Sequence, residues 1–274
     1  MLVLGVVCII AFALNEKFLA PVPFLQWDIL RSRTVMGACA LDVCYQVSYY
    51  CWYLYYTSFL QVNSGQSLQT AGYIASIFDV VSGLFLFAVG FAIKKTSRFR
   101  WMLYWAVPLY MLGQGLMIYF RKPDQPVGYL IMCQIFLAFA GGAMIIVQQV
   151  AVLAASDHQN VAGSLAFLGV FGNIGGSVGG SVSAAIWQGT LPGALERYLP
   201  ADALPDLQSI YEDLEVQLSY LKGTETRLAI EKAYSVAQQH MDICGTAVMA
   251  LSLIWMFVIK DIKLDRKQTK GVLF

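Results

Sequence analysis

Seven apolar segments follow one another along the chain, separated by short polar connections and by one long connection. They cover residues 2–14, 34–59, 71–93, 101–120, 127–155, 161–187 and 241–259. All but the first approach or exceed the roughly 20 apolar residues that a membrane-spanning helix needs. The pattern therefore predicts an all-α membrane protein.

The first segment is too short to cross a bilayer, since 13 residues at 1.5 Å per residue reach only about 20 Å. It also lacks the basic start of a signal peptide, and Asn15-Glu16-Lys17 is a poor cleavage site. We interpret it as the end of a helix that begins upstream of Met1. This interpretation predicts that the chain is a C-terminal fragment.

Basic residues predict the orientation of the helices. They gather before the second segment, between the third and fourth, and after the last: Lys17, Arg31, Arg33, Lys94, Lys95, Arg98, Arg100, Lys260, Lys263, Arg266, Lys267 and Lys270. If successive helices alternate in direction, all three groups lie on one side, which the positive-inside rule makes cytoplasmic. The predicted organisation is a helix end with a cytoplasmic connection (1–33), five transmembrane helices (34–187), a long extracytoplasmic loop (188–240), a last helix (241–260) and a basic cytoplasmic tail (261–274).

Two carboxylates interrupt this apolar pattern. Asp42 and Asp79 each lie about 12 Å into a predicted helix, near the bilayer midplane. A centred aspartate costs roughly 3 kcal/mol on insertion scales, so each needs a partner, a proton or a wet cavity. Gln46, Tyr49 and Tyr53 share the Asp42 face, and small residues surround Asp79, so both faces should point into the bundle. These five residues are candidates for a substrate or proton pathway; the alternative is a structural, hydrogen-bonded role.

The sixth segment carries a stripe of small residues. Helical spacing places Gly172, Gly176 and Gly179 on one face, where small side chains let neighbouring membrane helices approach closely. We expect this stripe to serve helix packing, or a helix that bends or slides as part of a moving machine. In the long connection, apolar residues recur every three or four positions from Leu207 to Leu221, which predicts one helical face.

Composition excludes several classes of function. Only 13% of residues are charged and the net charge is +1, which argues against a nucleic-acid partner. The six cysteines form no C-x-x-C pair and join no histidine cluster, so no metal site and no cofactor is predicted. The sequence contains no nucleophile, zinc or phosphate-loop motif, which argues against an enzyme. His240 and Asp242, where the long connection enters the last helix, are interpreted as a hydrated helix end.

Three stretches resemble a known family. The basic turn GFAIKKTSRFRWML resembles the second-half counterpart of the loop found in major facilitator transporters. Together with DHQNVAGSLAFLGVFGNIGGSVGGSVSAAIW and LPGALERYLP, it is similar to fungal siderophore–iron transporters, fourteen-helix members of that superfamily. The resemblance covers nearly the whole chain. It implies that the six complete segments are the C-terminal six-helix half and that the first is the end of the preceding linker helix.

The resemblance also implies a function. Members of this family import ferric siderophores with protons through the plasma membrane or an endosomal vesicle membrane. The implied partners are thus a ferric siderophore, protons, the lipid bilayer and the missing N-terminal six-helix half. The long outer loop is implied to handle the substrate, which makes candidates of Tyr198, Tyr211, Tyr220 and Tyr234. Because the siderophore supplies the ligands of the ferric ion, the carrier needs an aromatic, hydrogen-bonding cavity rather than metal ligands.

Three alternatives stay open at this point. A drug:proton antiporter of the same superfamily would share the helix pattern, although the long tyrosine-bearing loop disfavours it. A seven-helix receptor fits the number of segments but not the short first one. A truncated product that only assembles with other membrane proteins is the third. Since such carriers move two six-helix halves around a central site, one half alone is expected not to transport.

Overall fold

The computed structural model describes residues 2–18, 31–123, 125–156 and 161–264, and the DHQN stretch at 157–160 and the end of the basic tail lie outside them. Every regular element in these ranges is a helix, as expected for an all-α membrane protein. Five helical stretches there are long and apolar enough to cross a membrane: Leu68–Thr96, Trp101–Phe120, Val127–Ala155, Val161–Tyr198 and Glu225–Val258. The chain is a multi-pass membrane protein, and the predicted fold class is confirmed.

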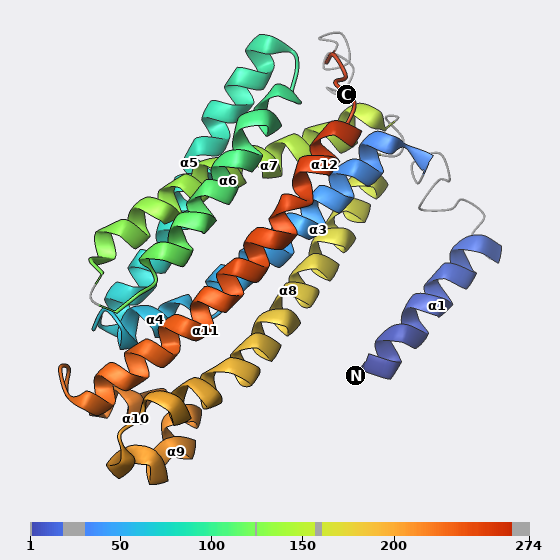
Figure 1. Cartoon of the computed structure of the whole chain (residues 1–274). Helices are drawn as coiled ribbons and strands as arrows, with labels where there is room; N and C mark the ends of the chain where they lie inside the picture. Colours follow the sequence, from blue (N-terminus) through green and yellow to red (C-terminus); the bar gives the residue numbers. More distant parts are fainter. Residues whose placement is uncertain (1, 19–30, 124, 157–160, 265–274) are drawn as a thin grey trace.

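The bundle is built around α3 (Arg33–Tyr53), which packs most extensively against α8 (Val161–Tyr198) and also contacts α11 (Glu225–Ala250). On its other side, α6 (Trp101–Phe120) and α5 (Leu68–Thr96) both pack on α7 (Val127–Ala155). Figure 1 shows α11 running between the α5–α6–α7 group and α8. The helix α1 (Leu2–Phe18) extends four residues beyond the predicted segment, and most of its described apolar side chains are exposed.

Two of the predicted transmembrane segments are interrupted. The second segment forms α3 and a short helix α4 (Tyr56–Val62), separated at Leu54 and Tyr55. The last forms α11 and α12 (Ser252–Val258), separated at Leu251. Neither interruption contains glycine or proline, so the local sequence does not predict either of them.

The long connection is shorter in the structure than the predicted loop at 188–240. Helix α8 continues to Tyr198 through Pro192, and α11 already begins at Glu225, capped by the Thr224 hydroxyl, which accepts from the Arg227 amide. The single helical face expected between Leu207 and Leu221 is split into α9 (Leu207–Glu212) and α10 (Leu214–Ser219), after a 3-10 turn η2 (Ala201–Asp206). The split occurs because Asp213 is extended and its carboxylate caps α10 through the Glu215 amide.

Candidate functional site

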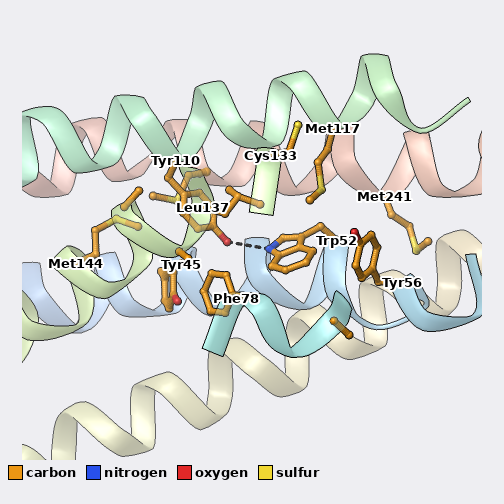
Figure 2. Close-up of a cluster of buried hydrophobic side chains, with 14 of the residues drawn as sticks. Tyr45, Trp52, Tyr56, Phe78, Tyr110, Met117, Cys133, Leu137, Met144 and Met241 are labelled. Carbon is orange, nitrogen blue, oxygen red and sulfur yellow. Dashed lines mark hydrogen bonds between the residues drawn. The ribbon is translucent and has the colours of Figure 1, made fainter. Parts of the chain in front are cut away.

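An aromatic cluster runs along α3. Tyr49 and Tyr53 stack one turn apart with ring centroids separated by 5.0 Å, as side chains four positions apart on a helix do. Phe78 of α5 contacts the rings of both Tyr49 and Trp52. The Trp52 indole N–H donates to the Tyr110 hydroxyl of α6 at 3.1 Å, which Figure 2 shows as the dashed line. Tyr49 and Tyr53 stay partly exposed, whereas Trp52 and Tyr110 are buried.

Asp42 lies at the contact between α3 and α8. Its side chain is 7% exposed and faces Gly172, where an added Cβ would lie 2.6 Å from the Asp42 Oδ2 atom. The same Cβ would lie 3.8 Å from the Gln46 side-chain nitrogen. The glycine therefore provides the space in which this carboxylate sits. Among the described residues, Asp42 makes no side-chain hydrogen bond or ion pair, so it occupies a buried position without a counter-charge.

The glycine stripe of α8 lies directly on α3. A Cβ at Gly176 would meet the Tyr50 ring at 2.9 Å, and one at Gly179 would meet the Val47 backbone at 2.8 Å. Gly175 is equally close to the backbone of Val43. Contacts with backbone atoms cannot relax by a change of rotamer, so Gly175 and Gly179 hold the two helices at a separation that only glycine allows.

Asp79 has a different environment. It lies on α5 next to the buried Phe78, but its own side chain is exposed. The expectation that its face points into the bundle is met only in part within this chain: Ala75 and Ser82 are buried, whereas Ser76 and Asp79 are exposed. The preceding residue, Phe78, packs against Tyr49 and Trp52 of α3, so Asp79 lies one position along α5 from the aromatic cluster.

The four outer tyrosines are not equivalent. Tyr198 ends α8 and is exposed, and Tyr211 and Tyr220 are partly buried. Tyr234 instead lies in α11 with only 3% exposed, and its hydroxyl donates to Gln217 at 2.6 Å. Its ring meets Trp187, on which Tyr55 stacks at 4.2 Å.

A buried pair of charges was missed by the analysis of the sequence. Arg121, directly after α6, and Asp242 of α11 both have fully buried side chains, with 3.3 Å between the arginine Nε and the Asp242 Oδ2 atoms. The interpretation of Asp242 as a hydrated helix end is wrong, because α11 begins well before it and packs this turn against α3 and α6. An acid inside an apolar run was the available signal; its partner could not be read from local sequence.

No group of three or more histidine, cysteine or carboxylate side chains in the described ranges could hold a metal ion. Helix α3 instead presents the aromatic and amide side chains of Tyr49, Tyr53 and Gln46. The buried carboxylate of Asp42 lies on the same helix, and the exposed carboxylate of Asp79 lies on α5. Such a surface suits a large ligand bound by stacking and hydrogen bonds, and carboxylates that could exchange a proton.

Comparison with known proteins gives matches over the whole, or nearly the whole, of this chain. The chain is 68% identical over all 274 residues to the MFS siderochrome iron transporter D of Aspergillus fumigatus. It is 50% identical to the siderophore iron transporter mirB of Emericella nidulans, again over the whole chain, and 36% identical over 98% of the chain to the siderophore iron transporter 1 of Schizosaccharomyces pombe. These alignments cover 46%, 46% and 44% of the relatives, so the chain spans slightly less than half of their length. No protein-family profile matches it.

Proposed function

We propose that this chain, a homologue over its whole length of the fungal siderochrome iron transporters of the major facilitator superfamily, forms the C-terminal half of a ferric-siderophore importer. Its homologues are transporters and not enzymes. The observation that carries the proposal is the 68% identity over all 274 residues, which includes the helices of the site and the outer segment alike.

The substrate in this proposal is a ferric ion already enclosed by its siderophore. Such a complex is large, polar at its rim and coordinatively saturated, so recognition depends on stacking and hydrogen bonding. Tyr49, Tyr53 and Gln46 supply these groups from α3. Tyr49 packs against Phe78 of α5, the residue before Asp79, and Gln46 lies beside the glycine stripe of α8. The outer tyrosines Tyr198, Tyr211 and Tyr220 would meet the complex earlier, on its way into the carrier.

Import is proposed to be coupled to protons. A carboxylate in an apolar bundle is more stable when protonated, unless a counter-charge accompanies it. Asp42 is buried without such a counter-charge, and Asp79 is exposed on the face left open by this half. We propose that Asp79 lines the substrate pathway. We propose that Asp42 lies at a contact between α3 and α8 that changes during transport, when α8 moves along α3.

Transport also needs a second half. Carriers of this architecture move two helix bundles around a site near the midplane, and this chain provides one bundle. The proposed partner is an N-terminal six-helix half, preceding this chain in a single polypeptide. The proposed location is the plasma membrane or an endosomal vesicle membrane.

The test is uptake of radiolabelled ferric siderophores by an iron-starved yeast strain that lacks its own siderophore carriers. The strain would express this chain joined to an N-terminal half. Saturable uptake that collapses on addition of a protonophore is the expected result. A protein that reaches the membrane but takes up no ferric siderophore would overturn the proposal, and resistance of the same cells to toxic drugs would then favour an exporter.

A further inference from the structure

The aromatic helix α3 is broken where it passes the buried charges. Regular structure stops at Tyr53 and resumes at Tyr56 as α4. A helix end leaves backbone carbonyls without the N–H partners that a continuing helix would provide, and inside a membrane protein water does not replace them. At this break the Tyr50 and Tyr55 carbonyls still accept backbone bonds, from the Leu54 amide at 3.3 Å and the Phe59 amide at 3.0 Å. The Trp52 carbonyl accepts instead from a side chain outside α3 and α4.

Three side chains from outside α3 and α4 contact the carbonyls around this break. Arg121 donates from Nη2 to the Trp52 carbonyl oxygen at 2.6 Å. The Ser183 hydroxyl of α8 lies 3.2 Å from the Tyr50 carbonyl and 2.8 Å from the Gly179 carbonyl of its own helix, and Gln238 of α11 donates to the Tyr55 carbonyl at 3.2 Å. Side chains from the end of α6, from α8 and from α11 thus contact carbonyls on both sides of the break, and only Arg121 takes the place of a backbone donor, at Trp52.

Arg121 makes the central contact of this arrangement. Its guanidinium also donates to the Gln238 side-chain oxygen and lies over the rings of Tyr56 and Phe59, at 5.1 and 5.8 Å from their centroids. A positive charge at the C-terminal end of α3 is favoured by the helix dipole. Only the planar, multiply donating guanidinium can contact α3, α4 and α11 at the same time.

Asp242 balances this charge but contributes nothing to the break directly. Neither of its carboxylate oxygens has a hydrogen-bond partner among the described residues, and its contact with Arg121 is an ion pair at 3.3 Å. Removing one member of such a pair leaves the other as an uncompensated buried charge. Arg121 therefore has two roles that different contacts serve: the ion pair with Asp242 balances its charge, and the hydrogen bond to the Trp52 carbonyl supports the break.

We propose that Arg121 is a positioning residue that fixes the break between α3 and α4, with Asp242 as its counter-charge on α11. Because Arg121 contacts both α11 and α4, the position of α11 determines where α4 lies relative to the end of the aromatic cluster. A movement of α11 away from α6 would separate Gln238 from the Tyr55 carbonyl and would remove Asp242 and the Gln238 oxygen from Arg121, the residue that holds the Trp52 carbonyl. If the aromatic cluster binds substrate, loss of the fixed break should also weaken substrate affinity; this consequence rests on the proposed transport function, whereas the support of the break does not.

The test compares variants of the full-length protein by hydrogen–deuterium exchange of residues 50–62 in detergent. Arg121→Lys keeps the charge balance and loses the shared contacts, and Arg121→Gln combined with Asp242→Asn removes both charges together. We expect both proteins to accumulate in the membrane and to exchange this segment about tenfold faster than wild type, a factor that corresponds to about 1.4 kcal/mol. Lys122→Gln, which alters the exposed neighbour, is the matched control and should exchange like wild type.

Wild-type exchange in the double variant would show that the pair only balances charge, and wild-type exchange in Arg121→Lys would show that any cation suffices. Either result overturns the proposal. The measurement uses no siderophore, so it is independent of uptake. If the wild-type protein takes up no ferric siderophore, the proposed transport function is contradicted, but the exchange result is unaffected. If wild-type uptake is present, an unchanged apparent KM in the double variant would overturn the link to the aromatic cluster.

Discussion

At the scale of single residues, the two aspartates illustrate how position on a helix decides what a carboxylate can do. Both lie at the same depth in their segments by sequence, yet Asp42 is buried against a glycine helix and Asp79 is exposed. Sequence alone could predict that each is costly in a membrane. It could not predict which face a neighbouring helix covers, because that depends on tertiary contacts.

We expect Asp79→Asn in the full-length protein to abolish proton-coupled uptake while membrane insertion stays intact. The amide keeps the size of the side chain but cannot carry a proton, and Asp42→Asn should have the same effect. Initial uptake rates measured across external pH would test both. Asp202→Asn, an exposed change in the outer segment, is the control; wild-type pH dependence in the two membrane variants would contradict the proton role.

The glycine stripe gives a sharper residue-scale prediction. Gly179→Ala would place a methyl group 2.8 Å from the Val47 backbone, whereas a Cβ at the adjacent Gly180 would meet nothing within 4 Å. Overpacking of this kind costs about 1–3 kcal/mol. Gly179→Ala should therefore lower the thermal unfolding temperature of the purified protein, and Gly180→Ala should not. Equal stability of the two variants would mean that α8 and α3 are not in close contact.

At the scale of helices, hydrophobic periodicity predicted the membrane segments because each needs a long apolar run, and α5, α6 and α7 begin or end close to the predicted positions. The helix ends near water were harder. Helices α8 and α11 extend beyond the apolar runs, since polar residues are acceptable in a helix once it leaves the membrane core. The break in α3 was not predictable, because the side chain that binds the Trp52 carbonyl there, Arg121, comes from a distant part of the sequence.

The outer segment shows a second element held by an arginine. Arg227 of α11 donates to the Gln217 carbonyl in α10 and, at 2.7 Å, to the Val62 carbonyl at the end of α4. We expect Arg227→Gln to loosen α9 and α10 and to speed tryptic cleavage after the exposed Lys222. Limited proteolysis would measure the rate. Lys232→Gln, an exposed change on the same helix, is the control, and unchanged cleavage in Arg227→Gln would mean that other contacts hold the segment.

At the scale of the whole molecule, the basic groups meet at one end of the bundle. Arg98 pairs with Asp261 at 2.6 Å, the Leu264 amide donates to the Ser97 carbonyl, and the Lys260 amide donates to the Thr34 hydroxyl at 3.4 Å. The start of α3 and the ends of α5 and α12 therefore lie together, which the predicted orientation requires. Residues Arg266, Lys267 and Lys270 of the predicted tail lie outside the described range.

This arrangement predicts that the basic end faces the cytoplasm. In a cysteine-free background, Ser209→Cys in the outer segment should react with a membrane-impermeant maleimide on intact cells. Ser97→Cys, at the basic end, should react only after the cells are permeabilised. The reverse pattern would invert the proposed orientation and would place the tyrosines of the outer segment on the cytoplasmic side.

The open face of α5 leads to the last prediction. Large apolar residues of this helix, among them Val80, Leu84 and Phe87, are exposed next to Asp79. Apolar side chains are stable against lipid, but a carboxylate is not, so we infer that the Asp79 side of the helix faces a second bundle.

The chain expressed alone should therefore accumulate in the membrane without taking up ferric siderophore. Co-expression with a separate N-terminal half should produce uptake, and the two halves should co-purify. Uptake by the chain alone would contradict the two-half arrangement, whereas co-purification that is lost in Asp79→Leu but kept in Leu84→Ala would place the interface at the carboxylate.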